Sequence, residues 1–305
     1  MKYLSIFVFC LFFYASTDAP ASEDAKEITP ILEIKKNNKT VAYVIGVMHQ
    51  FPKNSGSLAS EKVKNLISKS AGLVTELGLN QFVFGEDAIE DAMENARGGR
   101  ALSSVIPVEL FNLIEDKLTP IYGENTHRLL EESHPLKAGN VLLALCPVEM
   151  NKHSTEAELI MIAAAADLPI LSIESVAEQV ESFPPYEASL WHSYLASILN
   201  YINIPNCAEL HRDSLRRLAY AALSGNLSLL ENALNDSYGT LNLKEFDDYS
   251  MVQRNKRMTK RILKLAESKK VFVFAVGARH LPGPQGILAQ LKLHKYTIKQ
   301  IETQP

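Results

Sequence analysis

Residues 271–280 read Val-Phe-Val-Phe-Ala-Val-Gly-Ala-Arg-His. Six consecutive apolar residues, rich in β-branched and aromatic side chains, are typical of a strand buried on both faces of a parallel sheet. The run leads directly into Gly277 and, three residues later, into His280. The stretch therefore predicts an α/β fold in which ionisable side chains follow the strands at their carboxyl ends.

Three further apolar runs are each followed by an ionisable residue. The run at 41–45 is followed by His49, the run at 72–75 by Glu76, and the run at 169–173 by Glu174. The first run follows another at 31–34 across an Asn-Asn turn, which predicts a β-hairpin. A last strand is expected at 296–298. The strands at 72–75, 169–173 and 271–276 are expected to be buried on both faces of the sheet.

Between the strands, apolar residues recur at a spacing of three to four, which predicts helices. The expected helices cover 57–70, 155–167, 186–203, 208–224, 227–235, 243–268 and 286–293. We expect a central mixed, largely parallel sheet with helices on both faces and helical insertions at about 80–150 and 183–245. No long Gly/Ser linker divides the chain, so residues 22–305 are expected to form a single domain.

Composition excludes several classes of protein. The 305 residues are 47% apolar and 22% charged, which argues against wholesale disorder. The formal net charge of −4 offers no basic surface for nucleic acid. No apolar run approaches the roughly 18 residues that a membrane-spanning helix needs.

The first 21 residues have the pattern of a secretory signal peptide. Lys2 is followed by an apolar run at 4–15 and then by Ala19-Pro20-Ala21, a small-x-small cleavage site. We therefore expect the chain to be exported to the periplasm or secreted, with no membrane association beyond the signal peptide. Two cysteines, Cys146 and Cys207, would remain after cleavage. One disulfide is possible, but two buried thiols are the expectation because a core of this size does not need a staple.

The four ionisable residues at the strand ends are the candidate site. Parallel strands bring their carboxyl ends to one edge of a sheet, so His49, Glu76, Glu174 and His280 can converge there. We expect the side chains of His49, Glu76 and His280 to meet in one cleft, although each residue taken alone could be a solvated side chain. Two imidazoles with carboxylates suit a catalytic divalent-metal site, and they suit acid–base chemistry without a metal equally well. The glycine three residues before each histidine is expected to let the backbone turn tightly.

Four segments resemble the TraB/GumN family. Residues 46–49 with 74–77 resemble its opening motif, residues 271–291 its closing motif, Arg254-Asn255 its Arg-Asn helix start, and residues 171–179 its Leu-Glu-Thr…Gln segment. Three positions depart from the family pattern. Glu156 stands where the family usually has Asp, Asn226 replaces the Asp of a Gly-Asp pair, and Ser175 replaces Thr.

The resemblance implies a hydrolase with an erythromycin esterase/ChaN-like fold. The family includes the TIKI proteins, which are metal-dependent proteases, so the leading hypothesis is a metallopeptidase-like enzyme acting on a peptide, protein or ester. His49, Glu76 and His280 would bind a divalent metal ion (Mn, Co or Zn), and Glu174 would orient a ligand or act as general base. Arg254 would hold a substrate carboxylate or orient Glu76, and Arg279 would stabilise an oxyanion. For these two arginines the alternatives are that Arg254 belongs to a solvated basic face with Arg257, Lys260 and Arg261, and that Arg279 points to solvent.

Two alternatives stay open at this point. One is a metal-independent His/Glu esterase-type hydrolase, and the other is a non-catalytic protein that binds haem or another small ligand. The other histidines lack partnered spacing and are expected to be structural or on the surface. Trp191 is expected to pack with its helical neighbours rather than to contact a ligand.

Overall fold

The computed structural model describes residues 30–151, 153–241 and 243–301. The predicted signal peptide at 1–21 lies outside the described residues. The chain forms a six-stranded mixed sheet in the order β4-β3-β5-β2-β1-β6. The strands are β1 (Ile31–Lys36), β2 (Lys39–Val47), β3 (Leu73–Thr75), β4 (Ile170–Ser172), β5 (Phe272–Gly277) and β6 (Thr297–Gln300).

Four neighbouring strands of the sheet are parallel. β5 pairs in parallel with β2 on one side and with β3 on the other, and β3 pairs in parallel with β4. β1 is antiparallel to both of its neighbours, β2 and β6. The hairpin turn has Asn37 and Asn38 at φ of 50° and 62°, a conformation that asparagine tolerates well. The predicted mixed, largely parallel α/β fold is therefore confirmed.

Among the residues that the structure describes, the seven helices predicted from the apolar spacing are present with shifted ends, four more lie in the helical insertion expected at about 80–150, and the short helix Val176–Val180 was not predicted. They are α1 (Glu61–Ser68), α2 (Leu79–Arg97), α3 (Val108–Tyr122), α4 (Thr126–Glu131), α5 (Pro135–Leu143), α6 (Thr155–Ala165), α7 (Val176–Val180), α8 (Leu190–Ile202), α9 (Cys207–Ser224), α10 (Leu227–Leu241), α11 (Lys244–Ala266) and α12 (Ile287–Leu293). Three short 3₁₀ helices lie at Leu102–Ser104, Gly123–Asn125 and Ala278–His280. None of the helices in the described part of the chain is long and apolar enough to cross a membrane.

Helices cover both faces of the sheet because side chains alternate along each strand. Phe272, Phe274 and Val276 of β5 pack in one apolar cluster with residues of α11 and α12. Val273 and Ala275 point to the other face and pack in a cluster with residues of α1 and α6. All six residues of β5 are buried, as a central parallel strand requires.

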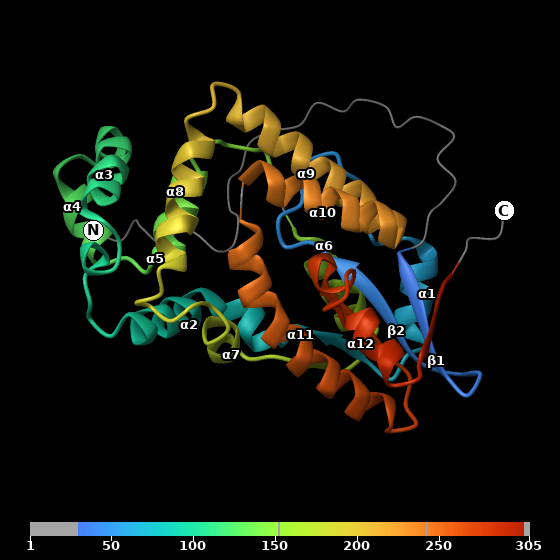
Figure 1. The fold of residues 1–305 in the computed structure, drawn as a ribbon. Coiled ribbons are helices and arrows are strands. Elements are labelled where there is room, and N and C mark those ends of the chain that lie inside the picture. The colour runs from blue at the N-terminus through green and yellow to red at the C-terminus, as the bar shows by residue number, and fades with distance from the viewer. Residues whose placement is uncertain (1–29, 152, 242, 302–305) are drawn as a thin grey trace.

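The helical insertions carry an apolar core of their own. It combines residues of α3, α5 and α8 with Phe246 of α11, and Trp191 lies fully buried within it. The packing role predicted for Trp191 is confirmed. Figure 1 shows α3, α4, α5 and α8 on the side of the molecule away from β1 and β2, with α11 running between the two parts.

Two expectations about local structure are wrong. The apolar run at 169–173 is not buried on both faces, because β4 is an edge strand and Leu171 is 37% exposed. Cys146 and Cys207 are not two free thiols, since they form a disulfide with their Cα atoms 5.5 Å apart. The two cysteines are 61 residues apart, and the bond links the segment after α5 to the first residue of α9, so it connects the two helical insertions.

Candidate functional site

The ionisable residues predicted from the strand ends do come together. β2, β3, β4 and β5 run parallel, so their carboxyl ends lie at one edge of the sheet. His49 follows β2, Glu76 follows β3, Glu174 follows β4, and His280 ends the 3₁₀ helix after β5. The Nε2 atom of His49 lies 3.9 Å from Glu76 Oε2, and the Nε2 atom of His280 lies 3.6 Å from Glu76 Oε1.

Glu76 is the centre of this arrangement. Its side chain is 2% exposed, and it accepts hydrogen bonds from the backbone N–H of Gly277 at 2.5 Å and from Nη2 of Arg254 at 2.6 Å. Burial alone would raise the pKa of the Glu76 carboxyl. The Arg254 guanidinium, which donates to this carboxyl, instead holds its pKa well below its usual range, so Glu76 is a carboxylate at neutral pH.

His280 has a defined orientation and tautomer. Asn255 donates from its amide nitrogen to the Gln285 carbonyl at 2.9 Å, which leaves its amide oxygen as the acceptor for His280 Nδ1–H at 2.6 Å. Desolvation and the positive charge of Arg254 lower the pKa of His280 to about 3. The ring is therefore neutral, and its Nε2 lone pair faces Glu76.

His49 has a different environment. Its side chain is 43% exposed, whereas His280 is almost completely buried. Nδ1 of His49 lies 3.1 Å from Oε2 of Glu156, a residue of α6 that is itself buried. Desolvation lowers the pKa of His49, but the carboxylates of Glu156 and Glu76 outweigh this effect and raise the pKa above its ordinary value.

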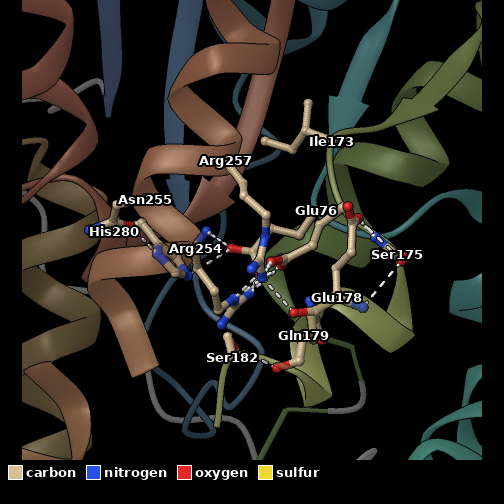
Figure 2. Close-up of polar contacts among 12 residues, drawn as sticks. Glu76, Ile173, Ser175, Glu178, Gln179, Ser182, Arg254, Asn255, Arg257 and His280 are labelled. Carbon is tan, nitrogen blue, oxygen red and sulfur yellow. Dashed lines mark hydrogen bonds and ion pairs between the residues drawn. The ribbon is translucent and has the colours of Figure 1, made fainter. Parts of the chain in front are cut away.

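A network of arginines from α11 holds the carboxylates in place. Arg254 and Arg257 are three residues apart and so lie on the same side of the helix. Both donate to Glu174, Arg254 Nη2 at 2.8 Å and Arg257 Nη2 at 3.2 Å. Arg254 thus bridges Glu174 and Glu76, and Figure 2 shows it lying between Asn255 with His280 on one side and the α7 segment on the other.

The network continues to α7. Glu178 closes the capping box of this helix with Ser175, and it also pairs with Arg261 of α11 at 2.5 Å. The hydrogen bonds of the Arg261 guanidinium outweigh the raising effect of burial and help lower the pKa of Glu178 to about 2. Figure 2 shows the Ser175 and Glu178 contacts beside those of Arg257. The edge of the sheet, α7 and α11 are therefore joined by one set of ion pairs.

Arg279 lies differently from its neighbour His280. Its side chain is 49% exposed and forms an ion pair with Asp247 of α11. This contact accounts for its orientation, and the role in oxyanion stabilisation stays a prediction. Of the two readings of Arg254, the contacts favour the one in which it orients Glu76.

The glycines of the two Gly-x-x-His motifs do not make tight turns. Gly46 pairs with Val276 inside the sheet, and neither Gly46 nor Gly277 has a positive φ. The expectation of a turn is wrong, and the physical reason for Gly277 is close approach. A Cβ there would lie 2.9 Å from Glu76 Oε1 and 3.3 Å from His280 Cδ2.

Two contacts of the site were not assigned a role from sequence. From the sequence, Glu156 is noted only as a departure from the family's Asp. Arg257 was interpreted as part of a solvated basic face. Asn255, the partner of His280, lies in the quoted Arg-Asn motif, so that motif is the sequence signal for one such partner.

Within the described ranges, no group of three or more His, Cys, Asp and Glu side chains is already arranged as a metal site. The hydrogen bonds that Glu76 accepts from Arg254 and Gly277 occupy one position on each of its oxygens. The residues that a metal would need are nevertheless close together, and both imidazole Nε2 atoms are directed at one carboxylate.

Comparison with known proteins gives one result that covers most of the chain. Searches of curated proteins and of solved structures each gave no match. The model of the TraB/PrgY/gumN family matches residues 30–300, which include all six strands and every site residue described above. The chain belongs to the TraB/PrgY/gumN family.

Proposed function

We propose that this protein is a metal-dependent hydrolase, related in mechanism to metallopeptidases, that acts on peptide or ester bonds. His49, Glu76 and His280 are the metal ligands in this proposal. Peptides, proteins and esters are the substrate classes that a site of this kind serves.

One observation carries the proposal: the Nε2 atoms of both histidines face opposite oxygens of a single buried carboxylate, at 3.9 and 3.6 Å. Metal–ligand bonds of about 2.0–2.2 Å place neighbouring ligand atoms roughly 3–4 Å apart, and each histidine lies at such a spacing from an oxygen of Glu76. Each Nδ1 atom lies beside a side-chain oxygen, of Glu156 for His49 and of Asn255 for His280. Metal-binding histidines characteristically have such a partner on the other ring nitrogen.

The chain's own residues would divide the remaining work. A divalent ion such as Mn, Co or Zn would supply a Lewis acid that polarises a carbonyl and activates water near neutral pH. Arg254 would keep Glu76 ionised and fixed in direction, and Asn255 would keep the His280 lone pair toward the ion. Glu174 suits the orienting role better than the general-base role, because it is buried and both of its oxygens accept from arginines.

A metal-independent hydrolase is the second candidate, and the surroundings of His49 favour it. This partly exposed imidazole lies between the carboxylates of Glu76 and Glu156, which raise its pKa and keep it protonated near neutral pH. His49 would then donate its proton to the leaving group as a general acid, with Glu76 orienting the ring. Arg254 already compensates part of the charge of Glu76, which reduces its need for a metal cation.

Metal content and activity together separate these candidates. The measurement is the metal content of the purified protein, with hydrolysis of a fluorogenic peptide and a chromogenic ester before and after chelation. We expect a bound divalent metal that is lost in His49→Ala and His280→Ala and kept in the matched control His127→Ala, whose ring is exposed beside Glu115. Activity that survives complete metal removal but is lost in His49→Ala would favour the metal-free enzyme. A haem absorption band without hydrolysis would favour the ligand-binding alternative.

We further propose that the protein is exported by the signal peptide predicted at residues 1–21. The disulfide between Cys146 and Cys207 supports this, because such bonds persist in oxidising compartments and are rare in the cytosol. Cell fractionation with mass spectrometry of the mature amino terminus tests the proposal. A chain that stays in the cytosol with its first 21 residues intact would contradict it.

A further inference from the structure

The loop that carries His49 is held along its length by the segment that precedes α6. Backbone N–H groups of Asn151 and Lys53 donate to the carbonyls of Phe51 and Glu149, at 2.7 and 3.0 Å. Closer to the site, Met48 N–H donates to Thr155 Oγ1 at 2.7 Å, and Thr155 N–H donates to the Met48 carbonyl at 3.1 Å. The residue before His49 is thus fixed to the residue before Glu156.

Glu156 lies directly after this contact, in the first turn of α6. The helix is capped by Ser154, whose hydroxyl accepts from Ala157 N–H. Glu156 is only 2% exposed, and its Oε2 atom lies 3.1 Å from Nδ1 of the His49 ring. The pairing of Met48 with Thr155 therefore places the side chain of Glu156 beside Nδ1 of the His49 ring.

The second oxygen of Glu156 is the unusual feature. Oε1 is buried and has no hydrogen-bond partner among the described residues. A buried carboxylate oxygen without a donor costs free energy, so stability of the fold does not explain an acidic side chain here. A function for the carboxylate at His49 does explain it, since that imidazole is the polar group that Glu156 contacts within the described part of the chain.

We propose that Glu156 is a positioning residue for His49. It accepts the hydrogen on Nδ1, which fixes the ring orientation and leaves Nε2 directed at Glu76 as the reactive nitrogen. Asn255 has the parallel role at His280. The partly exposed His49 ring thus has a charged acceptor, Glu156, and the buried His280 ring has a neutral acceptor, Asn255. The inference rests on the proposed function in one respect, namely that His49 belongs to the reacting site.

Three variants test this role. Glu156→Gln keeps the shape of the side chain but replaces one oxygen with an NH₂ group, so the amide cannot act as an acceptor of the same strength. Glu156→Asp keeps the carboxylate on a side chain shorter by one methylene. The matched control is Glu115→Gln, which changes the exposed carboxylate beside His127 at 3.3 Å. Zn²⁺ affinity is measured by competition with a chelator, and the ring nitrogens of His49 and His280 by ¹⁵N NMR.

We expect Glu156→Gln to weaken Zn²⁺ binding by about 10- to 100-fold, the usual effect of losing such a partner, and to shift the His49 resonances while those of His280 stay in place. Glu156→Asp should recover part of the affinity, and Glu115→Gln should match the wild type. If the wild type binds no Zn²⁺, the metal-dependent function fails and the NMR comparison alone decides the role of Glu156. Unchanged affinity and unchanged His49 resonances in Glu156→Gln would overturn the inference while leaving the metal site intact.

Discussion

At the residue scale, Gly277 shows how closely the site is packed. Its N–H donates to Glu76, and a Cβ would lie 2.9 Å from the carboxylate oxygen that accepts this bond. We predict that Gly277→Ala displaces Glu76, lowers the free energy of unfolding by about 1–3 kcal/mol through overpacking, and weakens Zn²⁺ binding. Urea denaturation and Zn²⁺ titration measure the two effects.

Gly46 is the matched control for that variant, because it holds the same place in the other Gly-x-x-His motif. A Cβ there would meet Leu281 Cδ1 at 3.0 Å and Ala278 at 3.2 Å, and no site carboxylate. Gly46→Ala should therefore lose stability but retain Zn²⁺ affinity. Wild-type Zn²⁺ affinity in Gly277→Ala would show that the close approach to Glu76 does not matter for binding.

At the element scale, α5 begins at a histidine whose titration affects stability. His134 is 4% exposed, caps the helix through Nδ1, and packs edge-on against Trp191. Desolvation lowers its pKa to about 4. The unfolded chain takes up this proton near pH 6.5 and the folded chain does not, so stability falls as the pH drops from 6.5 toward 4, by about 3 kcal/mol.

His134→Asn tests that assignment, because asparagine keeps the capping acceptor and cannot titrate. The variant should be less stable than the wild type at pH 7, where it loses the contact with Trp191. Its stability should then fall less steeply between pH 6.5 and pH 4, as urea denaturation at a series of pH values would show. Parallel curves for the two proteins would mean that His134 is not the group that titrates.

The elements also show what could be predicted from sequence. The strands that precede His49, Glu76 and His280 were predictable because continuous apolar runs and the Asn-Asn turn are local signals. The exposure of Leu171 was not, because it depends on the strand order, which places β4 at the edge of the sheet. The contact of Glu156 with His49 was also hidden, since it requires the pairing of two segments about 100 residues apart.

At the scale of the whole molecule, the disulfide connects parts of the helical insertions. Cys146 and Cys207 are 61 residues apart, and both pack in one small apolar cluster with Tyr201 of α8, a proximity that spacing in the sequence does not reveal. Closing a loop of this length restricts the unfolded chain. We predict that the Cys146→Ser/Cys207→Ser double variant lowers the free energy of unfolding by about 4 kcal/mol.

Urea denaturation of the wild type with and without reductant, beside the double variant, checks this value. Reduction should bring the wild type to the stability of the variant and leave the variant itself unchanged. Zn²⁺ affinity should stay the same throughout, because the disulfide contacts none of the site residues described. Equal stability of the oxidised wild type and the variant would show that the bond is absent or makes no contribution.

The central claim is that His49, Glu76 and His280 bind one divalent metal ion at the carboxyl edge of the sheet. Anomalous diffraction from crystals of the Zn²⁺-loaded protein tests it most directly, because the peak locates the metal independently of any assay. The account predicts a single strong peak about 2.0–2.2 Å from Nε2 of each histidine and from an oxygen of Glu76. A fully loaded protein whose anomalous peak lies elsewhere, or crystals that show none, would contradict it.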